Sequence, residues 1–252
     1  MDRVVTDLPP AVVVSVVARS LLVQAAWNYD SLQGVGAAFA ILPALEHLHP
    51  DPDDLAQALQ RHAEPFNAHP YLSSLALGSF CRMEAEGEPG ERIRRFRTAV
   101  GGPLGALGDR LVWAAWLPLC TVVAVCLYLA GLGPLWTVLI FLAVYNAGHV
   151  TLRIWGFREG WEAGIGLAVR LRSAGLANLS SRVERWLVTA LGFLVGLAIL
   201  APALRGELAL PWAAAALSAL ALGAALGPRV WRPTAAVTVA AVASILTFGF
   251  FL

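Results

Sequence analysis

Apolar residues in the second half of the chain form five successive stretches, each roughly as long as a membrane-spanning helix. A spanning helix needs about 20 mostly apolar residues, because the hydrocarbon core of a bilayer is about 30 Å thick. The stretches cover residues 111–131, 134–152, 186–204, 211–227 and 233–252. We therefore predict about five spanning helices in this part of the chain.

The first hundred residues carry apolar stretches that are shorter or interrupted. Arg19 and Gln24 interrupt the stretch 11–29, and the stretches 34–45 and 71–80 are too short to cross a bilayer. Non-helical backbone is tolerated at membrane depth only where protein buries it or where it lines a cavity. We therefore expect broken or re-entrant helical hairpins here, packed against other protein.

A different segment, DPDDLAQALQRHAEPF, lies between these short stretches at residues 51–66. It begins with acidic residues and carries apolar residues at helical spacing, which predicts an amphipathic helix at the membrane interface or on a cytoplasmic surface. Together the patterns predict an all-α, polytopic helical membrane protein. Residues 1–110 would form its core region and residues 111–252 its transmembrane region.

The composition agrees with an integral membrane protein. Hydrophobic residues make up 58% of the 252 positions and charged residues only 14%, whereas a soluble domain carries about 25% charged residues. All 18 basic residues are arginines, which excludes Schiff-base chemistry and a phosphate-loop lysine. The net charge of +1 gives no general attraction to nucleic acid, so we expect no nucleic-acid partner.

The arginines are unevenly distributed along the chain. The segment RMEAEGEPGERIRRFR holds five and the segment 153–185 holds six, whereas the connectors GLGP and RGEL hold one between them. Arginine-rich connectors stay on the cytoplasmic side of a membrane. We therefore predict a cytoplasmic loop at 153–185 and a C-terminus on the outer side.

Several local patterns point away from an enzyme or a metal site. No G-K-[ST] follows GGPLGALGD, so this glycine-rich run is not a phosphate loop, and we expect a tight re-entrant turn ending in Asp109 as the cap of the first spanning helix. Ser73 and Ser74 lie close to His69 in sequence but lack a G-x-S-x-G context. The histidines follow no metal-binding spacing, so we expect no metal and no cofactor; they are His47, His49, His62, His69 and His149.

A ridge of small residues is also present, since Gly156, Gly160 and Gly164 recur every four positions. This spacing lets helices approach closely in a membrane. The ridge would pack either within the chain or against a membrane partner.

Four motifs appear in a fixed order and carry a family resemblance. They are QAAWNYDSLQGVGAAFAILPAL, RHAEPFNAHPYLSSLALG, GGPLGALGD and FLAVYNAGHVTLRIWGFREGWEAG. In this order and spacing, from about residue 18 to about residue 200, the chain resembles the IID component of the mannose-family sugar phosphotransferase system (PTS) permeases. The chain departs from the family's usual residues at four positions: Arg110 stands for Pro, Leu117 for Arg, His69 for Gln and His149 for Arg.

The resemblance implies a multi-pass protein of the bacterial cytoplasmic (inner) membrane. It would be a translocation subunit that moves a hexose inward together with a IIC membrane subunit, while a soluble IIAB phosphocarrier phosphorylates the sugar. The IID chain itself would carry no phosphorylation site. The alternative is an orphan IID-like protein with a regulatory or structural role and no transport.

The polar stretch QAAWNYDSLQ, at residues 24–33, suits the recognition of such a sugar. Amides donate and accept hydrogen bonds without adding charge, and an indole ring covers the apolar face of a hexose. If the stretch is helical, residues 24, 27, 28 and 31 share one face. The expected substrate-binding residues are Gln24, Trp27, Asn28, Gln33, Asn67 and Asp109. The alternative for each amide is a hydrogen bond that joins helices inside the membrane.

Overall fold

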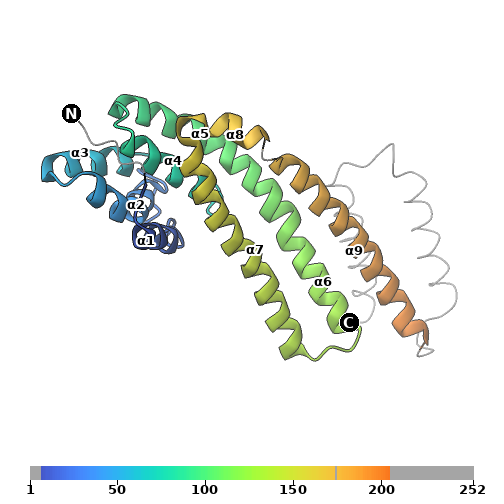
Figure 1. The fold of residues 1–252 in the computed structure, drawn as a ribbon. Coiled ribbons are helices and arrows are strands. Elements are labelled where there is room, and N and C mark those ends of the chain that lie inside the picture. The colour runs from blue at the N-terminus through green and yellow to red at the C-terminus, as the bar shows by residue number, and fades with distance from the viewer. Residues whose placement is uncertain (1–6, 174, 205–252) are drawn as a thin grey trace. The chain divides into compact units, whose positions relative to one another are not determined.

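The computed structural model describes residues 7–173 and 175–204 (Figure 1). These residues form helices joined by turns, and their only extended pairings are two isolated backbone bridges, Asn28–Leu32 and Leu32–Phe66. The all-α class is confirmed for this part of the chain. The predicted spans 211–227 and 233–252, and the predicted outer C-terminus, lie outside the described residues.

The helices are distributed over two compact units. The first comprises the chain up to Leu117 together with Ala143–Arg182, and the second comprises Pro118–Leu142 together with the chain from Val183 onward. In chain order the helices are α1 (Pro10–Ser20), α2 (Gly34–Leu48), α3 (Pro52–Ala63), α4 (Ser73–Ala85), α5 (Gly90–Gly108), the π-helix η1 (Asp109–Trp116), α6 (Leu117–Leu129), α7 (Pro134–Ala163), the 3-10 helix η2 (Gly164–Gly166), α8 (Leu167–Ser173) and α9 (Leu176–Leu204).

The first unit is built around α4, whose residues are almost all buried. Helices α1, α2 and α4 have 11, 15 and 13 residues, so each is too short to cross a bilayer, as the interrupted apolar stretches predict. Apolar side chains of these helices, together with Leu72 at the start of α4, form a core whose fully buried members include Val16, Ile41, Leu45, Leu75, Leu77 and Phe80.

The amphipathic segment forms α3, as predicted. Asp51 caps its N-terminus by accepting hydrogen bonds from the backbone N–H groups of Asp53 and Asp54. The carboxylates of the first turn also suit the positive end of the helix dipole. The helix turns Ala58 and His62 inward and leaves its opposite face exposed.

The glycine-rich run GGPLGALGD is helical, so the expected re-entrant turn is wrong. Helix α5 continues directly into η1 and α6, and Asp109 has helical backbone angles (φ −59°, ψ −43°), so it does not cap a new helix. Contacts of Gly101 and Gly108 with residues 67 and 69 stabilise the helix here. They override the weak helix propensity of glycine and proline.

The segment 153–185 is also helical rather than a loop. Helix α7 begins at Pro134, where the predicted span begins, but it runs on to Ala163 and is followed by η2, α8 and the start of α9. Two arginines of the segment have partners in the structure: Arg153 bonds to Ser20, and Arg170 pairs with Glu159 and Glu162. The regular helix stops only at Gly164, which has a positive φ of 50°.

The ridge of small residues packs within the chain. A Cβ at Gly156 would collide with the hydroxyl of Ser74, and one at Gly160 would collide with the carbonyl of Leu75. On α4, Gly78 is equally close to the carbonyl of Phe157. Helices α4 and α7 therefore cross at backbone contact, which the glycine spacing makes possible.

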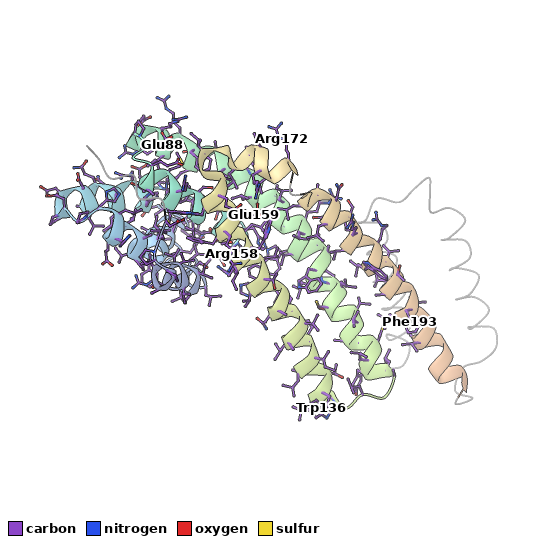
Figure 2. All side chains as sticks on the ribbon, in the orientation of Figure 1. Glu88, Trp136, Arg158, Glu159, Arg172 and Phe193 are labelled. Atoms are coloured by element: carbon purple, nitrogen blue, oxygen red, sulfur yellow. The ribbon has the colours of Figure 1, made fainter. Side chains whose placement is uncertain are left out.

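Two continuous helical stretches, Gly90–Leu129 and Pro134–Arg172, are long and apolar enough to cross a membrane. Few side chains in their most apolar windows are buried inside the protein, unlike those of a core helix in a soluble domain. In the second unit, large apolar side chains point outward (Figure 2), among them Trp136 (61% exposed) and Phe193 (67% exposed). Such a surface fits a lipid environment.

The arginine pattern makes the orientation of α7 testable. In a variant without Cys81, Cys120 and Cys126, we expect a membrane-impermeant maleimide to label Gly133→Cys on intact cells and Arg172→Cys only after the membrane is opened. Both positions are exposed in the structure. Labelling of Arg172→Cys on intact cells would reverse the proposed orientation.

Candidate functional site

The polar stretch 24–33 forms a loop of turns, so the helical face expected for residues 24, 27, 28 and 31 is wrong. The reason lies in Asn28. Its side-chain oxygen accepts hydrogen bonds from the backbone N–H groups of Asp30 and Ser31, both at 2.9 Å, and its NH₂ group donates to the Ser31 hydroxyl and the Ala26 carbonyl. A local turn of this kind competes with helix formation. It also uses both donors and both acceptor positions of the amide.

Gln33 joins this loop to the segment 64–69, which precedes α4. Its backbone N–H donates to the Phe66 carbonyl at 2.8 Å, and the N–H of Phe66 donates back to the Ser31 carbonyl at 3.2 Å. The buried side chain of Gln33 donates to the Ala68 carbonyl at 2.7 Å and accepts from the Ala68 N–H at 3.3 Å. These bonds form a seam between two of the sequence motifs.

Glycines bring the third motif onto the same segment. A Cβ at Gly101 would lie 2.5 Å from the Asn67 carbonyl oxygen, and a Cβ at Gly108 would overlap the side chain of His69. At the start of α2, Gly34 is similarly close to the carbonyl of Glu64. The three motifs, which lie far apart in the chain, therefore converge on the segment 64–69.

His69 lies at the centre of this convergence and has an unpaired donor. Its Nδ1 accepts a hydrogen bond from the Tyr71 N–H at 3.2 Å, so the proton of the neutral ring is on Nε2. The side chain is 2% exposed, and Nε2 has no hydrogen-bond partner among the described residues. Burial lowers the pKa of His69 to about 4, although the nearby Asp109 carboxylate acts in the opposite direction. The ring is therefore neutral at physiological pH.

The predicted site residues fall into three groups. The side-chain amides of Asn28 and Gln33 form hydrogen bonds within the protein, as described above. Asn67 and Asp109 are exposed; Asn67 comes two residues before His69 and its backbone carbonyl lies close to Gly101, and Asp109 follows Gly108, which lies close to the His69 ring. On the loop, Gln24 is exposed and Trp27 is 44% exposed, with its ring 5.0 Å from that of Tyr29.

Aromatic residues surround His69, and the sequence analysis did not identify them as part of the site. The indole of Trp113, on η1, is 5.3 Å from the His69 ring and partly exposed. Tyr71 packs edge-on against His69 at 5.2 Å, lies 6.0 Å from Trp113 and stacks on His149 of α7 at 3.8 Å. We call His69, Asn67, Asp109 and Trp113 the polar corner.

Arg153 of α7 lies behind these aromatic residues, with its guanidinium 5.5 Å from the centre of the Tyr71 ring. Its guanidinium is buried and donates to the carbonyl and hydroxyl of Ser20, the last residue of α1, and to Nε2 of His149 at 2.6 Å. A cation at the C-terminus of a helix interacts favourably with the helix dipole. Arg153 directly follows the apolar stretch 134–152, and a charged residue at that position was the available signal in the sequence, because such residues near a membrane span are usually functional or paired.

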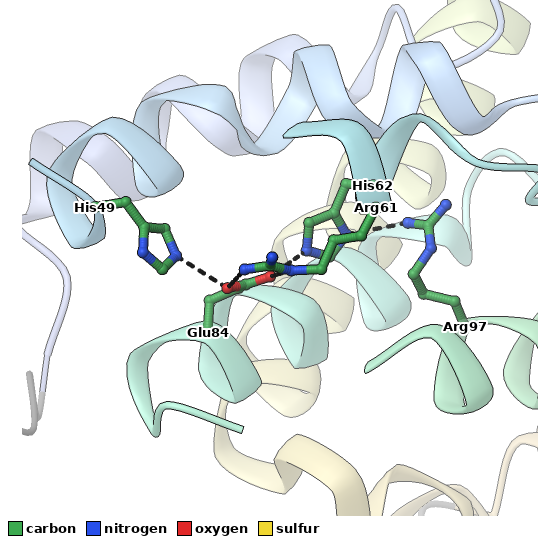
Figure 3. Close-up of polar contacts among 5 residues, drawn as sticks. All are labelled: His49, Arg61, His62, Glu84 and Arg97. Atoms are coloured by element: carbon green, nitrogen blue, oxygen red, sulfur yellow. Dashed lines mark hydrogen bonds and ion pairs between the residues drawn. The ribbon is translucent and has the colours of Figure 1, made fainter. Parts of the chain in front are cut away.

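A second polar cluster, centred on Glu84, holds the helices of the first unit together (Figure 3). The Glu84 carboxylate, 5% exposed, accepts two hydrogen bonds from Arg61, at 2.7 and 2.6 Å, one from His62 at 2.7 Å and one from His49 at 2.9 Å. Arg97 on α5 donates to Nδ1 of His62 at 3.1 Å. We call these five residues the Glu84 cluster.

The charges of the Glu84 cluster compensate one another. Burial alone would raise the pKa of Glu84, but its hydrogen bonds with Arg61, His49 and His62 outweigh burial and hold that pKa below its usual range. Burial lowers the pKa of His62 to about 4, more than its bond to Glu84 raises it. The cluster therefore contains an ionised carboxylate and a neutral His62.

Comparison with known proteins identifies a family. The family model for the PTS system mannose/fructose/sorbose family IID component matches residues 8–204. The mannose-specific EIID component of Escherichia coli K12 is 28% identical over 170 residues, which is 64% of this chain and 59% of that protein. The sorbose-specific EIID component of Klebsiella pneumoniae is 30% identical over 161 residues, 61% of this chain and 57% of that protein. The matches thus span less than two thirds of these relatives.

Solved structures show the same fold. A cryo-EM structure of the mannose transporter ManYZ in complex with microcin E492 matches with a TM-score of 0.59 and 26% identity, over 75% of this chain and 70% of that one. A further membrane-protein structure matches with a TM-score of 0.65 and 27% identity, over 75% and 71% of the two chains.

The Glu84 cluster predicts a large effect of one substitution. Glu84→Gln preserves the shape of the side chain but leaves Arg61 without its buried carboxylate partner, and breaking such a pair costs about 3–5 kcal/mol. We expect a clearly lower melting temperature of the purified protein. The control is Glu91→Gln, because Glu91 forms only an exposed pair with Arg95. Equal melting temperatures for the two variants would contradict a structural role for the cluster.

Proposed function

This chain belongs to the PTS mannose/fructose/sorbose family of IID components, and from that premise we propose that it is a membrane translocation subunit of a sugar permease. It moves a hexose-type sugar inward together with a IIC membrane subunit, and a IIAB phosphocarrier phosphorylates the sugar. It is a multi-pass protein of the bacterial inner membrane. The family match and the outward-facing apolar side chains of α7 and α9 support this proposal.

The observation that carries the proposed sugar site is the polar corner. In a mostly apolar protein, three motifs converge on a buried N–H donor without a partner and on an exposed amide, carboxylate and indole. An unpaired buried donor costs about 1–3 kcal/mol. Such a cost is consistent with a group that finds its partner in a ligand.

The chemistry of the polar corner matches a neutral hexose. The amide of Asn67 both donates and accepts, the carboxylate of Asp109 accepts, and Nε2 of His69 donates. The indole of Trp113 offers a flat apolar face for the C–H side of the ring. Where the family usually has Gln at position 69, the imidazole of this chain retains a donor.

The loop 24–33 contributes in two ways in this proposal. Trp27 and Gln24, which are exposed, line the sugar path at its edge. Asn28 and Gln33 fix the loop conformation and join it to the segment 64–69. Loss of Asn28 or Gln33 would then act on the sugar through the shape of the site.

Substitutions in the polar corner test the sugar site. We expect Asn67→Ala and Trp113→Ala to weaken hexose binding by roughly ten- to a hundredfold, because each leaves about 1–3 kcal/mol of contacts unmade. The melting temperature should stay the same for Asn67→Ala, whose side chain is exposed, and fall slightly for Trp113→Ala, whose ring packs on His69 and Tyr71. Binding of radiolabelled glucose, mannose and related hexoses to the purified complex measures the effect. The matched controls are Gln60→Ala, an exposed amide on α3, and Trp136→Ala. Normal affinity in both corner variants would refute this site.

Partnership is testable separately. Helices α1, α2 and α4 are too short to cross a bilayer, and polar side chains accompany them, so we expect the chain to require a IIC-type membrane subunit. A tagged chain purified from membranes that co-express its genomic neighbours should bring down one such subunit in stable stoichiometry. A monodisperse protein without any membrane partner would favour the orphan alternative.

A further inference from the structure

His62 lies between Glu84 and Arg97 in an ordered series of hydrogen bonds within the Glu84 cluster (Figure 3). The carboxylate of Glu84 can only accept and the guanidinium of Arg97 can only donate. The ring between them must therefore carry its proton on Nε2, which donates to Glu84 at 2.7 Å, and keep Nδ1 free to accept from Arg97 at 3.1 Å. The side chain of His62 is completely buried.

Arg97 extends this connection to the site segment. Its second Nη group donates to the Glu64 carbonyl at 2.9 Å, and its guanidinium lies over the ring of Phe66 at 5.4 Å. The carboxylate of Glu64 is occupied by a different residue, Arg94, at 2.7 Å. The hydrogen bonds from Arg97 to His62 and to the Glu64 carbonyl therefore fix the position of the buried guanidinium. Because Glu64 begins the segment 64–69, the same bonds hold the backbone that leads to Asn67 and His69.

We propose that His62 is a positioning residue for the sugar site: its neutral ring, held between Glu84 and Arg97, keeps the segment 64–69 in the conformation that presents Asn67 and His69. This inference rests on the proposed function, because it concerns the same site. The inference adds that His62, which is buried and does not contact the sugar, controls sugar affinity. Only its neutral form does so.

Protonation would break the connection. A protonated imidazole donates from both nitrogens, so Nδ1 would no longer accept from Arg97 and two cations would face each other. The charged and titratable groups around the ring are Glu84 from α4, Arg61 from α3, Arg97 from α5, and His49, which shares the Glu84 carboxylate.

The expected pH dependence follows from the burial of the ring. With the segment in place, the pKa of His62 is lowered to about 4 because of burial. With the segment released, the ring would titrate near about 6.5, the value of an exposed histidine. Acidification below about 6.5 therefore favours the released state, and sugar affinity should fall as the pH drops toward about 4.

The test compares the wild-type complex with His62→Gln and His62→Leu. Glutamine has a donor and an acceptor but cannot be protonated, whereas leucine has neither. At about pH 7.5 we expect His62→Gln to bind hexose within roughly fivefold of wild type and His62→Leu to bind about tenfold or more weakly. At about pH 5 the wild type should lose clearly more affinity than His62→Gln, in which only His69 of the site remains to be protonated.

Hydrogen exchange provides a readout that does not depend on sugar. The amides of Phe66 and Ala68 are protected by the seam in the structure. After correction for intrinsic rates, they should exchange faster in His62→Leu, and in the wild type at low pH, but not in His62→Gln. Identical pH profiles of exchange for wild type and His62→Gln would overturn the inference, even if one variant assembles poorly.

The two proposals can fail separately. If no complex binds hexose at neutral pH but the exchange of the segment 64–69 follows the protonation of His62, the proposed function fails and the positioning role stands. If hexose binds with the same affinity from about pH 7.5 to about pH 5 in wild type and His62→Gln, the sugar site stands and the positioning role fails.

Discussion

The compensation of one buried carboxylate organises the first unit of this protein. Glu84 is 5% exposed, and an ion at such a site is tolerated only when partners replace the water it has lost. Its partners come from the end of α2, from α3 and, through His62, from α5. Because the helices involved are short, the cluster gives them a common anchor that their individual lengths could not provide.

Close contacts at three glycines connect the helices of the first unit to the segment that holds the polar corner. Gly34, Gly101 and Gly108 each lie so close to the segment 64–69 that a side chain in their place would collide with it. These contacts set where the segment lies against α2 and α5 while the Glu84 cluster holds it in place. A site built from loop residues gains the rigidity of the helices around it, which is what the recognition of a neutral sugar by a few hydrogen bonds requires.

Much of the fold follows from local patterns, and the site follows only in part. The cap of α3 by Asp51, the start of α7 at Pro134 and the close approach at Gly156 and Gly160 could be predicted, because each depends on neighbours in sequence or on one helical period. The spacing of residues 24, 27, 28 and 31 would suit one face of a helix, whereas the side chain of Asn28 makes a turn in the loop 24–33.

Long-range contacts explain the remaining errors and omissions. Glycine and proline in GGPLGALGD favour a turn locally, but contacts with residues 67 and 69 stabilise a helix. The Glu84 cluster joins residues 22 to 35 positions apart, and no periodicity reveals such pairs. The unpaired donor of His69 is visible only once its surroundings are known.

The most direct test of the central claim is a cryo-EM structure of the purified complex with a bound hexose. The account predicts sugar density at the polar corner, with a hydroxyl within hydrogen-bond distance of the Asn67 amide and the ring against the indole of Trp113. A well-defined sugar elsewhere in the complex, with no atom in contact with Asn67, His69 or Trp113, would contradict it.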